Sequence, residues 1–142
     1  MNVYRLIVQN LVTMLLVIGL LSGCTRGPME PTRANVEKFT AIMQAASANM
    51  TAREIQAGQS SDEGKRRITK KLLVDPFEEA GFDLNATLRD FAVRLRDGNL
   101  TQDQAQAIMV VLSIYKDSVA DFARWGFINT ETSELVKAAA NG

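Results

Sequence analysis

The spacing of apolar residues between residues 34 and 139 is the feature that most constrains the fold. In the segments 34–57, 84–96 and 101–125, apolar residues recur at intervals of three and four, which places them on one face of a helix. No stretch alternates apolar and polar residues for long enough to form a strand. The pattern therefore predicts an all-α fold, a small bundle of four to five helices.

Capping residues set the expected helix boundaries. Asp83 is a suitable cap for 84–96, and Thr101 with Gln104 forms a capping box before 101–125. Gly58, Gly98 and Gly126 are natural stops. A second helix is expected over 62–74 and a short last one over 131–139. Pro76 should keep Asp75 out of the helical conformation and make it the cap of a brief turn.

The segment 101–125 is predicted to be the longest helix and to lie centrally. Its apolar residues cover so much of the helix circumference that two sides should pack against neighbours. One regular face consists of Ala105, Ile108, Leu112, Tyr115, Val119 and Phe122, and Met109, Val111 and Ile114 widen it.

The first 23 residues differ from the rest of the chain. Arg5 supplies a positive charge, the run from Leu11 to Leu21 is almost wholly apolar, and the small residues Ser22 and Gly23 follow. About 11 apolar residues are too few to span a hydrocarbon core, which takes ~20. A charged start, a short apolar region and small residues are typical of a secretory signal peptide.

The stretch Leu21-Ser22-Gly23-Cys24, which contains the single cysteine of the chain, resembles the lipobox of bacterial lipoproteins. In that family the cysteine sulfur receives a diacylglyceryl group, the signal is cut before the cysteine, and the new amine is acylated. A thiolate is the nucleophile that the lipid transfer needs. The resemblance implies lipidation of Cys24 and a membrane anchor of three acyl chains, which is a stable one.

The resemblance also implies a division of the chain. Residues 1–23 would be the lipoprotein signal peptide, 24–32 a lipidated tether, and 33–142 the helical domain. The tether reading rests on Gly27, Pro28 and Pro31, which break regular structure. Thr25, and not Asp, follows the cysteine, so in a Gram-negative source the outer membrane, on its periplasmic face, is the expected location.

Composition excludes several classes of function. The 16 basic and 16 acidic residues balance, which argues against a nucleic-acid partner. The chain has no histidine, the usual general base and zinc ligand, and no metal-ligand cluster or phosphate loop. We therefore expect no metal, no cofactor and no enzymatic activity.

The stretch from Lys65 to Lys71 carries five cations, namely Lys65, Arg66, Arg67, Lys70 and Lys71. It could contact anionic lipid headgroups or peptidoglycan carboxylates, because each cation near such a surface adds ~1 kcal/mol. The alternative is a solvated helix face, balanced by nearby acidic residues such as Asp62 and Glu63.

Trp125 and Phe127 form an aromatic pair at the end of a predicted helix. Aromatic clusters at such positions can dock a partner. The alternative is that the two side chains close the end of the core, with Phe127 as the hydrophobic contact after a C-terminal glycine.

These observations favour a non-enzymatic membrane lipoprotein whose small helical domain binds a protein partner in the envelope or supports an assembly. In size, anchor and helix content it is similar to the pilotins, which escort secretin subunits to the outer membrane. The alternative is direct binding of envelope lipid or peptidoglycan through Lys65–Lys71.

Overall fold

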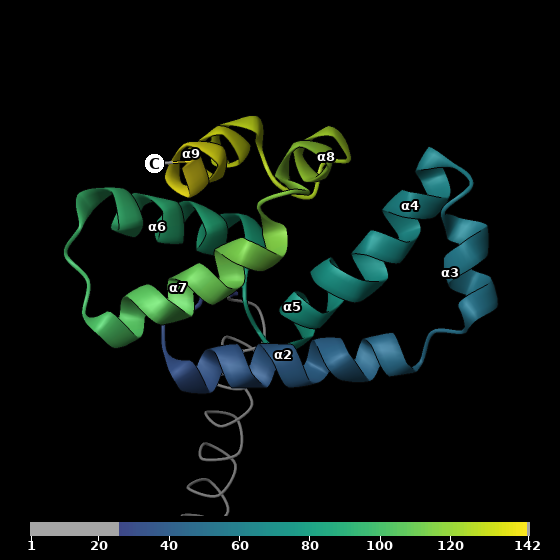
Figure 1. The fold of residues 1–142 in the computed structure, drawn as a ribbon, viewed down its shortest axis with the longest axis horizontal. Helices are drawn as coiled ribbons and strands as arrows, with labels where there is room; N and C mark the ends of the chain where they lie inside the picture. Colours follow the sequence, from purple (N-terminus) through teal and green to yellow (C-terminus); the bar gives the residue numbers. More distant parts are fainter. Residues whose placement is uncertain (1–25, 142) are drawn as a thin grey trace, which may run out of the picture.

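Helix α7 (Gln102–Tyr115) lies at the centre of the fold in the computed structural model, which describes residues 26–141. It contacts α2 (Arg33–Ala48) on one side and α6 (Leu84–Asp97) and α9 (Thr130–Asn141) on the other (Figure 1). The described residues contain helices and no strand, which confirms the all-α class. Cys24 and the predicted signal peptide lie outside the described residues.

Most predicted boundaries are confirmed by the caps. The Asp83 side chain accepts a hydrogen bond from the Ala86 N–H at the start of α6, and Gly98 ends that helix with a φ of 77°. Thr101 and Gln104 form the predicted capping box of α7. The first four N–H groups of a helix have no acceptor within the helix, and capping side chains supply one. Cap residues can therefore be recognised in the sequence.

Two of the expected helices are divided, so the bundle has more helices than four or five. The segment 34–57 breaks before Thr51, which caps α3 (Ala52–Gly58) through a capping box with Glu54. The segment 101–125 breaks at residues 116–118, and α8 (Val119–Arg124) follows. The expectation of one longest helix over 101–125 is therefore wrong, although its predicted apolar face is buried from Ile108 to Phe122.

The expectation that Pro76 keeps Asp75 out of the helical conformation and makes it a cap is also wrong. α4 (Asp62–Thr69) continues through the π-helical turn η1 (Lys70–Val74) into α5 (Asp75–Glu79). Asp75 is itself helical, with φ −60° and ψ −44°, and its N–H donates to the Lys70 carbonyl five residues back. The wider π turn gives the ring of Pro76 room that a regular α turn denies.

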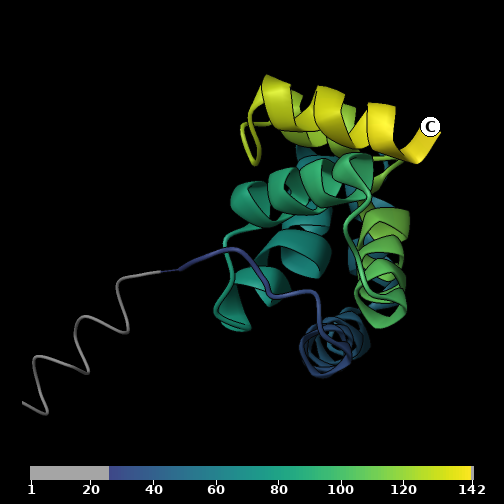
Figure 2. The same ribbon diagram turned by 90° about the vertical axis from the view of Figure 1, so that its left-hand side faces the viewer.

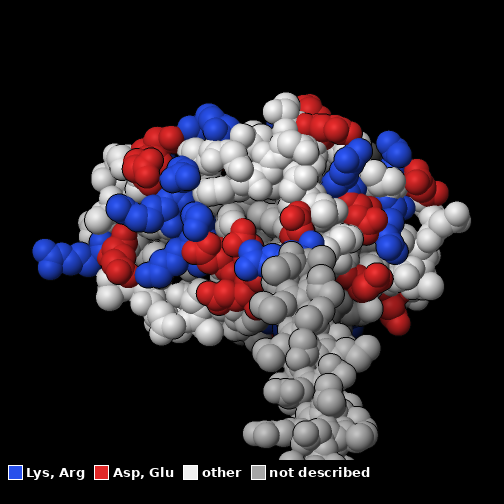
Figure 3. Space-filling view, turned by 180° about the vertical axis from the view of Figure 1, so that it is seen from behind, with Lys and Arg blue, Asp and Glu red and all other residues white. Residues whose placement is uncertain are grey.

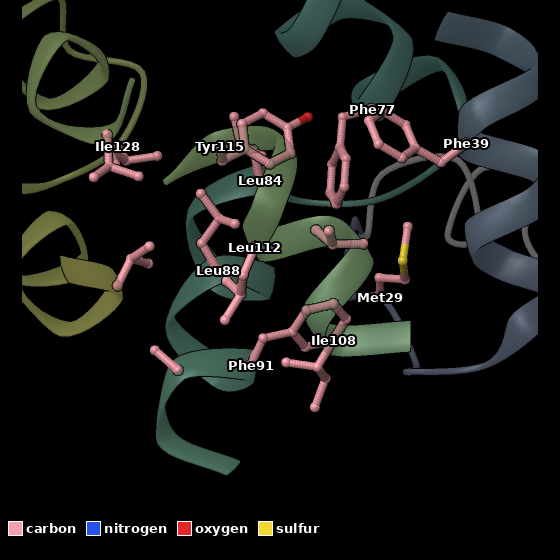
Figure 4. Packing of buried hydrophobic residues seen from close by; sticks show 14 of the residues in the cluster. Met29, Phe39, Phe77, Leu84, Leu88, Phe91, Ile108, Leu112, Tyr115 and Ile128 are labelled. Carbon is pink, nitrogen blue, oxygen red and sulfur yellow. The ribbon is translucent and has the colours of Figure 1, made fainter. Parts of the chain in front are cut away.

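The core contains an aromatic cluster that joins α2, α5, α7 and α8. Figure 4 shows Phe39, Phe77 and Tyr115 of this cluster among the aliphatic core residues. Phe39 and Phe77 meet edge to face with ring centroids 5.0 Å apart, and Tyr115 meets Phe122 at 5.6 Å. The Tyr115 hydroxyl donates to the Leu73 carbonyl in η1 at 2.6 Å. Burial raises the pKa of that hydroxyl, so it remains a donor at any ordinary pH.

The N-terminal residues 27–31, which the sequence predicts to be part of a tether, lie against the domain. The Gly27 carbonyl accepts from the Asp83 N–H at 2.9 Å, and the Met29 N–H donates to the buried Thr87 hydroxyl at 2.8 Å. The Met29 side chain is 1% exposed and belongs to the core. We call residues 27–31 the latch. Full burial of a methionine contributes about 1.5–3 kcal/mol, so the latch is part of the folded domain.

Candidate docking surface

The outer side of α7 carries two large apolar side chains that the fold leaves in solvent. Met109 is 50% exposed and Val110 is 45% exposed. The spacing places Met109 on the widened core face, but the core is complete without it, because Ile108, Val111, Leu112 and Tyr115 fill the interior. We call Met109 and Val110 the α7 ridge.

The ridge is flanked by two hollows. One, of about 320 Å³, lies between α2 and α7, and Val36, Ala107 and Val110 are among its lining residues. The other, of about 550 Å³, lies among α6, α7 and α9. Its lining residues are mostly apolar and four of them are alanines: Ala92, Leu95, Arg96, Met109, Leu135, Ala138, Ala139 and Ala140. Small side chains let a second backbone approach closely, so this hollow can take a helix with larger apolar residues.

The two hollows differ in the chemistry of their lining residues. The charged residues of the first hollow include Arg33 and Glu37, which pair with each other at 2.9 Å. Within residues 26–141, no group of histidine, cysteine or acidic side chains is arranged to hold a metal ion. The first hollow thus has a largely polar rim with Asp103 and Gln106 beside this pair, whereas Arg96 is the one charged residue that lines the second.

The predicted basic segment is largely neutralised by acidic neighbours. Arg66 pairs with Glu63 at 3.6 Å, Lys70 with Asp75 at 3.0 Å, and Lys71 with Glu54 at 3.9 Å. On the face seen in Figure 3, basic and acidic side chains are interspersed over the domain. Three of the five cations thus have partners, which favours the interpretation of a solvated, charge-balanced helix face.

Trp125 and Phe127 close one end of the core and remain partly accessible. Phe127 packs on Phe122 with ring centroids 5.7 Å apart, and its N–H donates to the Phe122 carbonyl after Gly126 turns the chain. The Trp125 indole N–H donates to Asp62 at 3.2 Å. This arrangement matches the interpretation in which the pair seals a helix terminus.

The structure brings the two predicted sites side by side. The Arg66 guanidinium lies 5.5 Å from the centroid of the Phe127 ring, and Asp62 binds both guanidinium nitrogens of Arg124 at 2.8 and 2.9 Å. The hydrogen bonds from Arg124, and then from Trp125, hold the pKa of the Asp62 carboxyl below its ordinary value. Bidentate geometry of this kind joins α4 to α8 at the surface of the domain.

The α7 ridge is not among the sites predicted from the sequence. The signal was present, because an apolar helix with a complete core face has surplus apolar residues that must lie elsewhere. Periodicity alone does not separate a helix buried on two sides from one with an exposed apolar edge.

Comparison with family models, with curated proteins and with solved structures finds no match to this chain. In the part of the chain that the structure describes, no helix has both the length and the apolar character needed to cross a bilayer.

Proposed function

We propose that the chain is a lipoprotein of the bacterial cell envelope, anchored through Cys24, whose helical domain binds an amphipathic helix of a protein partner. The α7 ridge with its flanking hollows is the observation that carries the binding half of this proposal. In a Gram-negative source the domain would work on the periplasmic face of the outer membrane, as a non-enzymatic assembly or adaptor factor. The anchoring half rests on the resemblance of Leu21–Cys24 to a lipobox.

A helix is the occupant that best fits the surface. The hollow among α6, α7 and α9 is bounded by three helices and lined by four alanines, whose small side chains would let a further helix approach closely. Helix-in-groove recognition uses apolar anchors from one face of the incoming helix, spaced three and four residues apart. Met109 suits such contacts, because an unbranched thioether adapts to irregular partners.

Binding of envelope lipid or peptidoglycan through Lys65–Lys71 is the weaker alternative. The acidic partners of Arg66, Lys70 and Lys71 would have to be displaced or would repel an anionic surface. Surface pairs of this type contribute little to stability, about 0–1 kcal/mol, but they cancel the local charge that such binding needs.

Mass spectrometry of the N-terminus tests the anchor. In protein purified from bacterial membranes we expect Cys24 to be the first residue and to carry acyl chains. In the Cys24→Ser variant the bond before residue 24 should stay intact and no acyl mass should appear. An unmodified thiol at Cys24 in membrane-derived protein would contradict the proposal.

Site-specific photo-crosslinking in living cells tests the docking surface. A crosslinker at position 109 should capture one recurrent envelope protein, and the crosslinked peptide should lie in an amphipathic helix of that protein. Val110→Glu should abolish the product, because a carboxylate beside the hollow opposes burial of apolar anchors.

The matched control is Ile55, which is 36% exposed on α3 and far along the chain from the ridge. A crosslinker at position 55 should not capture that protein, and Ile55→Glu should leave the product at position 109 unchanged. Capture that is equal at both positions, or that survives Val110→Glu, would refute the docking surface.

A further inference from the structure

We propose that the latch orients the domain on the membrane, with the corner between α5 and α6 (residues 78–83) against the lipid headgroups and the C-terminal end of α9 facing away. This inference rests on the proposed lipidation of Cys24 and adds to it a defined membrane-facing surface. The partner of that surface is the headgroup layer of the bilayer in which the acyl chains lie.

The latch first shortens the reach of the anchor. Successive Cα atoms are at most 3.8 Å apart, so three peptide units between Cys24 and Gly27 span about 11 Å at full extension. A free tether from residue 24 to residue 32 would span roughly 30 Å by the same measure. Gly27 is held against Phe82 and Asp83. The short distance that can separate Gly27 from Cys24 therefore also limits how far this part of the domain can lie from the lipid anchor.

The latch also fixes which part of the domain is nearest. Arg26, the first described residue, pairs with Glu78 at 3.2 Å, and Gly27 bridges to Phe82. The Phe82 ring is partly buried and has the Lys38 ammonium 5.8 Å from its centroid. The contacts of Arg26 and Gly27 with Glu78, Phe82 and Asp83 therefore hold the point of attachment at this one corner.

The rest of the fold extends away from that corner. Figure 2 shows the described chain entering on one side, beside the turn between α5 and α6, while the C-terminal end of α9 lies on the opposite side. The hollow among α6, α7 and α9 includes Ala138, Ala139 and Ala140 near that far end. The same orientation therefore leaves the proposed docking surface open to proteins of the aqueous compartment.

The corner carries three acidic side chains, Glu78, Glu79 and Asp83, and no basic one of its own. Arg26 and Glu78 neutralise each other, and Lys38 lies over an aromatic ring. Within a Debye length of about 8–10 Å, the remaining acidic side chains are repelled by anionic lipids, so charge does not hold this corner at the surface. Attachment at this point thus needs no further lipid-binding site, because covalent reach alone sets the position.

Energy transfer from single labelled positions to headgroup-labelled lipids tests the orientation. The probe is the full-length protein produced in bacteria and reconstituted into phosphatidylethanolamine and phosphatidylglycerol vesicles with an acceptor dye on the headgroups. Glu79→Cys and Ala140→Cys each supply one exposed thiol for a donor dye. Transfer should be clearly higher from position 79 than from position 140.

Lengthening the connection provides the matched variant. Insertion of about ten Gly and Ser residues after Thr25 leaves the latch and the core intact and adds up to ~35 Å of reach. The difference in transfer between positions 79 and 140 should then be lost. Equal transfer from the two positions without the insertion, or a difference that survives the insertion, would overturn the proposed orientation.

The unsubstituted chain separates this inference from the proposed anchor. If Cys24 is acylated, the unsubstituted protein takes up no thiol dye, and the comparison of positions 79 and 140 reports orientation alone. If the unsubstituted protein takes up dye at Cys24, the lipid anchor is absent, and this result contradicts both the proposed anchor and the proposed orientation. Acylated protein with equal transfer overturns only the orientation.

Discussion

At the residue scale, two buried hydroxyl groups of the core differ in whether they have a hydrogen-bond partner. The Tyr115 hydroxyl bridges α7 to η1 through the Leu73 carbonyl. The Thr132 hydroxyl on α9 is fully buried. Among the described residues, it is the one buried side-chain nitrogen or oxygen atom without a hydrogen-bond partner. A satisfied buried polar group contributes modestly to stability, whereas an unsatisfied one keeps its full desolvation cost.

Thr132→Val should therefore stabilise the protein. The change replaces an unpartnered hydroxyl by a methyl group of similar size and should raise the free energy of unfolding by about 1 kcal/mol. The Thr132 backbone N–H keeps its bond to Asn129 at 2.8 Å, so the start of α9 is unaffected. Urea denaturation followed by Trp125 fluorescence gives the measurement, and a lower midpoint for the variant would contradict the prediction.

Tyr115→Phe should have the opposite effect and lower the free energy of unfolding. Removal of the hydroxyl leaves the Leu73 carbonyl without this donor and should cost about 1–2 kcal/mol in the same titration. Equal effects of the two substitutions would mean that both hydroxyls are hydrated.

At the scale of elements, the approach of α3 to α4 depends on two glycines. A Cβ atom at Gly64 would lie 2.5 Å from the Gly58 carbonyl oxygen and 2.9 Å from its Cα, so backbone would have to move. A Cβ atom at Gly58 would instead meet the end of the Ile68 side chain, which can rotate away. The closeness of the two helices is thus set mainly at Gly64.

Gly64→Ala should destabilise the protein although alanine favours helices. The gain in helix propensity is about 1 kcal/mol. Overpacking against backbone should exceed that gain and give a net loss of about 1–3 kcal/mol. Thermal unfolding by circular dichroism measures the change. Gly27→Ala is the control, because a Cβ atom there meets nothing within 4 Å, and its effect should stay within about 0.5 kcal/mol.

The elements also show which signals a single sequence carries. Asp83, Thr101 and Gly98 set helix ends through local hydrogen bonds and backbone conformation, so the ends of α6 and the start of α7 are predictable. The break between α2 and α3 had an equally local signal in Thr51 and Glu54, but the apolar periodicity runs across it and conceals it. The π turn before Pro76 depends on how the neighbouring helices pack, and no local sequence pattern predicts it.

At the scale of the whole molecule, Met29 explains why the latch was not predictable. A lone apolar residue between Pro28 and Pro31 has no periodicity, and its burial depends on Thr87, which is 58 positions away. The docking surface is equally a property of the assembled fold, because its second hollow combines residues from three helices. The site at Trp125 and Phe127 could be located from sequence, and closure of the core was one of the two roles predicted for it.

The bond between Asp62 and Arg124 links the first half of the molecule to the second and makes part of the stability depend on pH. Because the folded-state pKa of Asp62 is lowered, this contribution is fully present above the unfolded pKa of about 3.9 and is lost as pH falls through the lower folded value. Asp62→Asn should lower the melting temperature near pH 7. The difference from the unsubstituted protein should shrink below about pH 4.

Melting curves recorded by circular dichroism from neutral to acidic pH give this comparison. Glu134→Gln is a suitable control, since its pair with Lys137 joins residues of one helix and bridges no two elements. A melting-temperature difference for Asp62→Asn that stays constant across the acidic range would contradict the assignment.

The latch also decides how the domain responds to mechanical load. A pull on the N-terminal end reaches the Gly27–Asp83 and Met29–Thr87 bonds before it reaches α2, because these bonds join the first described residues directly to α6 and its cap. While they hold, force passes into Asp83, α6 and the core, and the stretch of chain from residue 30 to residue 82 lies off this direct path. The latch is therefore the element that yields first under tension, and its rupture would release slack without unfolding the helices.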